Sequence, residues 1–176
     1  MNWSQIKREL QKKDKAELVG YLKRLFSLSA ENKSFLETNL SDSDGEPPEY
    51  YLREITESVN PDIDSPIDLK RGRKAIASFK KAAPEDLWGR VQLMMHFVEE
   101  GACFTLQYGD IDGPFYDSMT GMINSIFDLS GQLSSVEHSH LIKRFEQLDS
   151  ETADRIGWGF SDHISEINAE LQASSR

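Results

Sequence analysis

The sequence predicts an all-α protein, a compact bundle of about eight or nine helices built from successive helix hairpins. Two observations support this fold class. The chain contains seventeen Leu against five Val and five Thr, and leucine loses less rotamer freedom in a helix than the β-branched residues do. Apolar residues also recur at helical spacing along the chain. We expect one domain over residues 1–176, in which the hairpins could stack as a loose solenoid.

Residues 1–40 predict three short helices with amphipathic spacing. Asn2 or Ser4 could cap the first helix, Asp14 caps the second, and Ser29 begins the third. Because only about two or three residues would join one helix to the next, the helices must fold back on one another as hairpins. Their apolar faces consist of Trp3, Ile6 and Leu10, then Leu18, Leu22, Leu25 and Phe26, and finally Phe35, Leu36 and Leu40.

The fourth and fifth predicted helices flank an acidic connection. The fourth helix would start at Pro47 or Pro48 and end before Asn60-Pro61. The connection over residues 62–68 has no helical period. Ser65 or Asp68 would then start a fifth helix, which is strongly basic. The apolar faces of the two helices are Leu52, Ile55 and Val59 in the fourth, and Ile76 and Phe79 in the fifth.

The sixth helix has the best apolar stripe and is expected at the centre of the bundle. Pro84, Glu85 and Asp86 form a start signal, because proline suits the first helical turn and negative charge suits the helix N-terminus. The helix could continue through Gly101 to Tyr108, or stop at Gly101. The stripe consists of Leu87, Val91, Met94, Met95, Val98 and Ala102.

The remaining residues predict a seventh, an eighth and a last helix. A turn over residues 109–114 precedes the seventh helix, which ends near Gly131. Ser134 and Glu137 match a capping box before the eighth helix, and the last helix would run from about Ser150. The apolar faces are Phe115, Met119, Met122, Ile123 and Ile126, then Leu141, Phe145 and Leu148, and finally Ile156, Phe160, Ile164, Ile167 and Leu171.

The net charge of −10 is unevenly distributed. Residues 1–33 hold eight basic and four acidic residues, and residues 70–81 hold six basic and no acidic residues. An acidic protein repels nucleic acids and anionic lipids over about 10 Å, so any polyanion would have to bind these local basic strips. No apolar run approaches the roughly 18 residues of a membrane span. We therefore predict no association with membranes.

The single cysteine, Cys103, lies in an apolar stretch where a small buried hydrophobic residue is expected. One cysteine cannot form an internal disulfide, which favours a reducing compartment. The first residues alternate charged and apolar side chains and do not resemble a signal peptide. These observations together predict a cytoplasmic protein.

Three stretches of the chain share their residues with a known family. They contain Trp3, Ile6, Glu9-Leu10, Glu17-Leu18, Asn32-Lys33 and Phe35-Leu36, then Pro61-Asp62-Ile63-Asp64 and Arg73-Lys74-Ala75-Ile76, and finally Phe104 to Ile111. Together they resemble a family of uncharacterised bacterial all-helical proteins over most of the chain. The resemblance implies an all-helical fold and a bacterial origin. It implies no activity and no site residues.

The basic fifth helix is a candidate binding site. Its six positive charges within twelve residues could neutralise several phosphates, which makes a nucleic-acid-associated protein one alternative. Only Phe79 could stack on a base, and it occupies a core position. The favoured interpretation is that the helix pairs with the acidic stretch before it and with acidic faces elsewhere. The basic residues are Lys70, Arg71, Arg73, Lys74, Lys80 and Lys81.

Acidic turns are weaker candidates for a metal site. Alternating aspartates can bind hard cations, so a metal-dependent enzyme built on these turns is the second alternative. None of the turns fits the EF-hand template, and turn formation and helix capping explain the aspartates equally well. The acidic groups are Asp42, Asp44 and Glu46, then Asp62, Asp64 and Asp68, and finally Asp110, Asp112 and Asp117.

The histidines and the cysteine suggest no catalytic or metal centre. His96, His138, His140 and His163 lack the spacing and the accompanying glutamates of a di-iron bundle. His96 and Cys103 would lie about 10 Å apart along one helix, which is too far for a nucleophile and its base. We predict no catalytic residue, no metal and no cofactor.

Trp158 is the second candidate binding residue. It lies between Gly157 and Gly159, each of which costs about 1 kcal/mol in a helix relative to alanine, so the pair marks a close helix crossing or a break. A continuous helix would expose the indole, and tryptophan is frequent in interface hot spots. Packing against a neighbouring helix is the favoured explanation. The sequence thus favours a non-catalytic protein-interaction or scaffolding module, whose protein partner, pathway and oligomeric state it does not specify.

Overall fold

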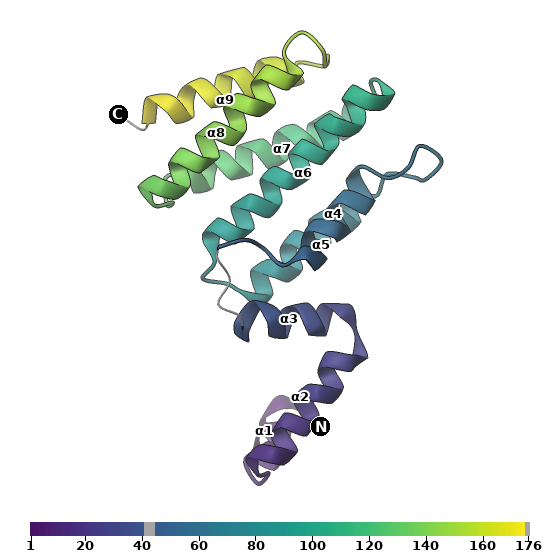
Figure 1. Ribbon diagram of the computed structural model, residues 1–176, viewed down its shortest axis with the longest axis vertical. Coiled ribbons are helices and arrows are strands. Elements are labelled where there is room, and N and C mark those ends of the chain that lie inside the picture. Colours follow the sequence, from purple (N-terminus) through teal and green to yellow (C-terminus); the bar gives the residue numbers. More distant parts are fainter. Residues whose placement is uncertain (41–44, 175–176) are drawn as a thin grey trace. The chain divides into compact units, whose positions relative to one another are not determined.

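The computed structural model describes residues 1–40 and 45–174, which form nine α-helices and no strand (Figure 1). The all-α class predicted from the sequence is confirmed. The helices are α1 (Trp3–Leu10), α2 (Lys15–Leu28), α3 (Ala30–Leu40), α4 (Glu49–Val59), α5 (Leu69–Ala82), α6 (Leu87–Tyr108), α7 (Gly113–Ser130), α8 (Ser135–Thr152) and α9 (Phe160–Ser174).

Contacts between residues divide the chain into two compact units. The N-terminal unit is Met1–Asp42 and contains α1, α2 and α3. The C-terminal unit is Ser43–Arg176 and contains α4 to α9. The C-terminal unit buries most of its large hydrophobic residues, whereas the N-terminal unit exposes most of its own.

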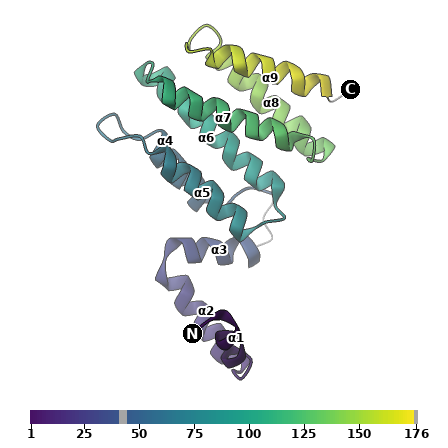
Figure 2. The ribbon, with the colours of Figure 1, turned by 180° about the vertical axis from the view of Figure 1, so that it is seen from behind.

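Three successive hairpins build the C-terminal unit, namely α4 with α5, α6 with α7, and α8 with α9 (Figures 1 and 2). The long helix α6 contacts α4, α5, α7 and α8. The prediction that this helix lies at the centre is therefore confirmed. The helices of each hairpin are antiparallel, as expected when the connection between consecutive helices is short.

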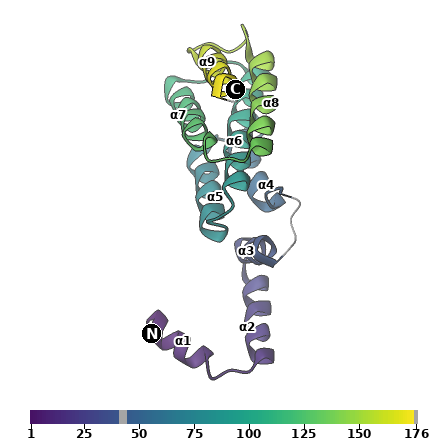
Figure 3. The same ribbon diagram turned by 90° about the vertical axis from the view of Figure 1, so that its left-hand side faces the viewer.

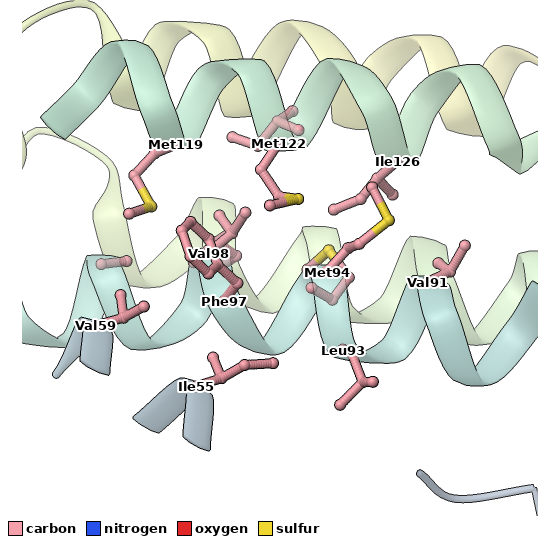
Figure 4. Packing of buried hydrophobic residues seen from close by; sticks show 14 of the residues in the cluster. Ile55, Val59, Val91, Leu93, Met94, Phe97, Val98, Met119, Met122 and Ile126 are labelled. Carbon is pink, nitrogen blue, oxygen red and sulfur yellow. The ribbon is translucent and has the colours of Figure 1, made fainter. Parts of the chain in front are cut away.

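The core of the C-terminal unit is organised around α6. Figure 4 shows Ile55 and Val59 of α4 on one side of this helix and Met119 of α7 on the other. Phe97 in the middle of α6 is fully buried. Full burial of such a side chain contributes about 1.5–3 kcal/mol, and α6 carries more buried hydrophobic residues than any other helix of the described residues, so it holds the layers together.

Side-chain caps fix several helix starts where the sequence predicts them. Asp14 and Ser134 each complete a capping box, before α2 and α8 respectively. Of the two candidates for the start of α5, Asp68 is the cap, because its side chain accepts a hydrogen bond from the backbone N–H of Arg71 at 3.0 Å. A cap acts within one helical turn, so local sequence suffices to predict it.

Helix α6 starts later than Pro84 suggests. Asp86 is the N-cap and accepts a hydrogen bond from the backbone N–H of Gly89 at 2.7 Å. Pro84 therefore lies in the preceding turn. At its other end α6 continues through Gly101 to Tyr108, which is the longer of the two predicted alternatives.

The prediction that the last helix starts at about Ser150 is wrong. Helix α8 continues to Thr152, and α9 begins only at Phe160. The intervening turn holds Asp154, Trp158 and Gly159 at positive φ, between 57° and 70°. This backbone conformation is incompatible with a right-handed helix, so the glycine pair marks a break.

Cys103 does not have the predicted burial. It lies on α6 but is exposed, beside Glu99 and Glu100 of the same helix and Arg144 of α8. The apolar residues around it in the sequence misled the prediction, since a helix in an apolar stretch still has a solvent side.

Candidate interaction surfaces

The N-terminal unit leaves most of its apolar side chains in solvent. Within residues 1–40 only Ser34 is buried, and α1 inclines away from α2 (Figure 3). The predicted hairpin of α2 and α3 forms, but the apolar faces of the three helices stay largely exposed. The exposed large hydrophobic residues of this unit are Met1, Trp3, Ile6, Val19, Tyr21, Leu22, Leu25, Phe26, Leu28, Phe35 and Leu40.

The C-terminal unit provides the contrast. Its larger surface exposes only four large hydrophobic side chains in the described residues, namely Ile63, Tyr108, Val136 and Trp158. Scattered exposure of this kind is normal for a folded protein, whereas contiguous apolar surface marks an interaction site.

None of the helices in residues 1–40 and 45–174 is long and apolar enough to cross a bilayer.

The apolar surface of α2 is wide. Its apolar residues cover about half of the helix circumference at 3.6 residues per turn, and α3 is the helix that packs against it. One neighbour covers only part of such a surface, so Leu18 is half-buried while Leu22 and Phe26 stay exposed. The apolar residues of α2 are Leu18, Val19, Tyr21, Leu22, Leu25, Phe26 and Leu28.

Sequence reasoning missed this width. The predicted stripe on α2 omits Val19, Tyr21 and Leu28, because a stripe defined by spacings of three and four residues is narrow. The signal was present in the sequence, since an apolar arc wider than one helix contact predicts a second neighbour.

An apolar groove runs between α2 and α3, and we call it the α2–α3 groove. It is lined by Val19, Leu22, Lys23, Phe26, Leu36, Glu37 and Leu40. The two charged residues have opposite signs and lie on different helices. Glu37 approaches Lys33 at 3.6 Å, and Lys23 forms no ion pair with any residue that the structure describes. The groove thus combines an apolar floor with one positive and one negative side chain.

Two aromatic residues of α2 are partly covered by positively charged side chains of the same unit. The guanidinium of Arg24 lies 4.6 Å from the centre of the Tyr21 ring, which is a favourable cation–π distance. The ammonium of Lys33 lies 5.8 Å from the centre of the Phe26 ring. Arg24 thus partly covers Tyr21, and Lys33 contacts the groove residue Phe26.

Two basic residues of α5 are bound within the C-terminal unit. Arg71 donates to Glu54 at 2.9 Å and to Glu57 at 2.6 Å, both on α4. This guanidinium lowers the pKa of the Glu54 carboxyl through its hydrogen bond. Arg73 donates to the hydroxyl of Ser118 on α7 at 2.6 Å. The pairing of Arg71 with acidic residues of α4 agrees with the predicted pairing of this helix with acidic surfaces, whereas Arg73 binds a hydroxyl group of α7.

The other basic residues of α5 face solvent. Lys70, Lys74, Lys80 and Lys81 are exposed and form no ion pair with the described residues. Phe79 is fully buried, so the one aromatic residue of this helix cannot stack on a base. The surface is a charged strip without the aromatic groups that single-stranded nucleic acids contact.

Trp158 is both exposed and packed against a neighbouring helix, which are the two alternatives that the sequence left open. The indole is 62% exposed, yet one ring face stacks on Tyr116 of α7 with ring centres 5.9 Å apart. The hydroxyl of Tyr116 donates to Asp110 at 2.9 Å, which holds the tyrosine in place. Trp158 is therefore a fixed surface residue of the turn before α9.

A polar cluster joins α4 to α6. The hydroxyl of Thr56 lies 2.8 Å from Nε2 of His96 and donates to Glu100 at 2.8 Å. The side-chain amide of Asn60 donates to the same carboxylate at 2.7 Å. Burial lowers the pKa of His96 below its ordinary value of 6.5, against the opposing attraction of Glu100. Each of these four polar side chains thus has a hydrogen-bond partner within the cluster, so the cluster requires no ligand.

Three aspartates of the acidic turns have structural roles. Asp68 caps α5, Asp112 caps α7, and Asp110 binds Tyr116. Within residues 1–40 and 45–174, no group of three or more His, Cys, Asp or Glu side chains could hold a metal ion. Asp42 and Asp44 lie outside the described residues.

Comparison of this chain with family models, with curated proteins and with solved structures finds no match. The resemblance drawn from the three sequence stretches, and the bacterial origin that it implies, therefore stay predictions. Function must be inferred from the surfaces of this chain alone.

Proposed function

We propose that this protein is a non-catalytic protein-interaction module that binds a protein partner through the α2–α3 groove. The observation that carries the proposal is the exposure of the apolar residues of α1, α2 and α3 in a chain whose C-terminal unit buries its own. Removing apolar surface from water is favourable by about 25 cal/mol per Å². A partner that covers the groove would gain this free energy.

The form of the groove favours a helical partner. Two consecutive helices with an apolar floor between them accept the apolar face of another helix, which is a common mode of protein recognition. Leu22 and Phe26 lie one turn apart on α2 and both line the groove. They would contact successive apolar residues of a bound helix.

The basic strip of α5 supports a nucleic-acid-binding function less well. Two of its six charges, those of Arg71 and Arg73, are used inside the C-terminal unit. The net charge of −10 would repel a polyanion at distances beyond the strip itself. We therefore place the binding function on the α2–α3 groove.

Site-specific cross-linking in the producing cells tests the proposal. Phe26 in the groove is replaced by the photoreactive residue p-benzoylphenylalanine, and the control carries the same residue at Val136, an exposed position on α8. Illumination should give protein adducts of defined mass from position 26 and not from position 136. Absence of protein adducts from position 26 would overturn the proposed function.

A further inference from the structure

We infer that the protein bound in the α2–α3 groove is a second copy of this chain, so that two chains associate through their N-terminal units. The inference rests on the proposed function and names the partner. Three features of the N-terminal unit support it. The groove carries two opposite charges, these charges lie on different helices, and the described residues of the unit include no buried hydrophobic residue.

An interface between two identical chains must be complementary to itself. The floor of the α2–α3 groove meets this condition, because apolar surface fits apolar surface. Its two charged residues meet it as well, since Lys23 on α2 and Glu37 on α3 have opposite signs. A surface that carries one cation and one anion can pair both of them with its own copy.

The positions of the two charged residues select the symmetry. A two-fold axis along the groove, lying between the two facing grooves, places α2 of one chain over α3 of the other. Lys23 of each chain then faces Glu37 of the second copy, which forms two equivalent ion pairs. An axis across the groove would instead place α2 on α2 and bring the two Lys23 side chains closer together. The charges therefore favour the first arrangement.

Partners of one dominant charge fit less well. An acidic helix or an anionic membrane surface would attract Lys23 but repel Glu37, and a basic helix would do the opposite. Lys23 forms no ion pair with the residues that the structure describes, and the Lys33 to Glu37 distance of 3.6 Å leaves the carboxylate able to accept a closer donor. Both side chains are available to a second copy.

The size of the N-terminal unit supports association. Segments of roughly 40 residues rarely form a stable core alone and usually need a metal, disulfides or oligomerisation. Within residues 1–40 only Ser34 is buried, and the single cysteine of the chain lies outside this unit. Pairing with a second copy would give Leu22, Phe26 and Leu40 a shared core.

Sedimentation of the purified full-length chain is the first test. The wild-type protein should sediment as a dimer at micromolar concentration and dissociate on dilution. Leu22→Asp, which places a charge on the groove floor, should sediment as a monomer with unchanged helical circular dichroism. Val136→Asp, a matched exposed position on α8, should remain a dimer.

A charge exchange identifies the second copy directly. Lys23→Glu and Glu37→Lys should each weaken self-association about tenfold, because both equivalent ion pairs become repulsive. An equimolar mixture of the two variants should recover wild-type affinity. In the mixed dimer the carboxylate introduced at position 23 meets the ammonium introduced at position 37, and the native Lys23 meets the native Glu37. Repulsion within one chain cannot produce this recovery, because both variants keep it in the mixture.

The outcomes separate this inference from the proposed function. A wild-type chain that stays monomeric at every concentration, or a mixture no tighter than either variant alone, would overturn the inference. If position 26 then cross-links to a different protein, the proposed function stands and only the identity of the partner is wrong. Cross-links between two copies of this chain support both.

Discussion

At the scale of single residues, glycines decide how closely helices approach. A Cβ atom added to Gly72 of α5 would lie 2.8 Å from Oγ of Ser58 and 2.9 Å from Cε2 of Phe97. No methyl group fits there unless the phenyl ring moves, and the ring is fully buried. Gly121 of α7 is also helical but has nothing within 4 Å of the same position. The two glycines therefore have different roles.

We predict that Gly72→Ala is less stable than Gly121→Ala by about 1–3 kcal/mol, the usual cost of overpacking a core. Both substitutions gain the same helix propensity, about 1 kcal/mol, so the difference isolates the close contacts with Ser58 and Phe97. Urea unfolding followed by circular dichroism measures both free energies. Equal stability of the two variants would show that α5 and α6 are not in close contact at Gly72.

At the scale of helices, polar side chains connect α4 to α6 inside an otherwise apolar contact. His96 shares the hydroxyl of Thr56 with Glu100. Burial opposes the charged imidazolium and lowers its pKa, whereas Glu100 and Glu99 raise it and Arg144 lowers it. The neutral ring is therefore the form that the folded protein favours.

This cluster predicts that stability falls in mild acid. The His96 pKa is lower in the folded than in the unfolded chain, so the unfolded chain binds the proton first as the pH drops. The contribution of neutral His96 to the free energy of unfolding is fully present above the pKa of the unfolded chain, near 6.5. It is lost below that pH, with a slope of at most about 1.4 kcal/mol per pH unit.

Urea unfolding between neutral pH and about pH 5, which spans the titration range of histidine, tests this expectation. His96→Gln should flatten the dependence of the unfolding free energy on pH. A wild-type curve as flat as that of His96→Gln would contradict the assignment.

At the scale of the whole molecule, the two units have different sources of stability. The hydrophobic core is confined to the C-terminal unit, from Tyr51 on α4 to Leu171 on α9. The described residues of the N-terminal unit form helices with defined caps but include no buried hydrophobic residue. The core cluster of the C-terminal unit thus includes no residue of the N-terminal unit.

A chain that begins at Gly45 should therefore fold. We expect cooperative thermal unfolding with a midpoint within a few degrees of that of the dilute full-length chain, because all residues of the core cluster remain. It should also sediment as a monomer. Circular dichroism melting and sedimentation measure both properties, and a truncated chain without a cooperative transition would show that the N-terminal unit contributes to the core.

Several features were predictable because their causes are local. Asp14, Asp68 and Ser134 cap their helices through bonds that close within one turn. The break before α9 was not predictable from periodicity, since Ile156 fits the stripe of a continuous helix and is buried in the turn all the same. Among the candidate site residues, Trp158 was identified, but the groove residue Leu22 was placed only on the apolar face of a predicted helix and not in a binding site.

Local sequence patterns were sufficient for the helices of residues 1–40 and 45–174, for most of their caps and for the central place of α6. Capping and helical periodicity depend on residues within a few positions of one another. Which apolar faces are covered became clear only from the arrangement of the helices. Phe97 of α6 packs against Gly72 of α5, whereas Leu22 of α2 is exposed to solvent, because burial depends on neighbours on other helices that the local pattern does not specify.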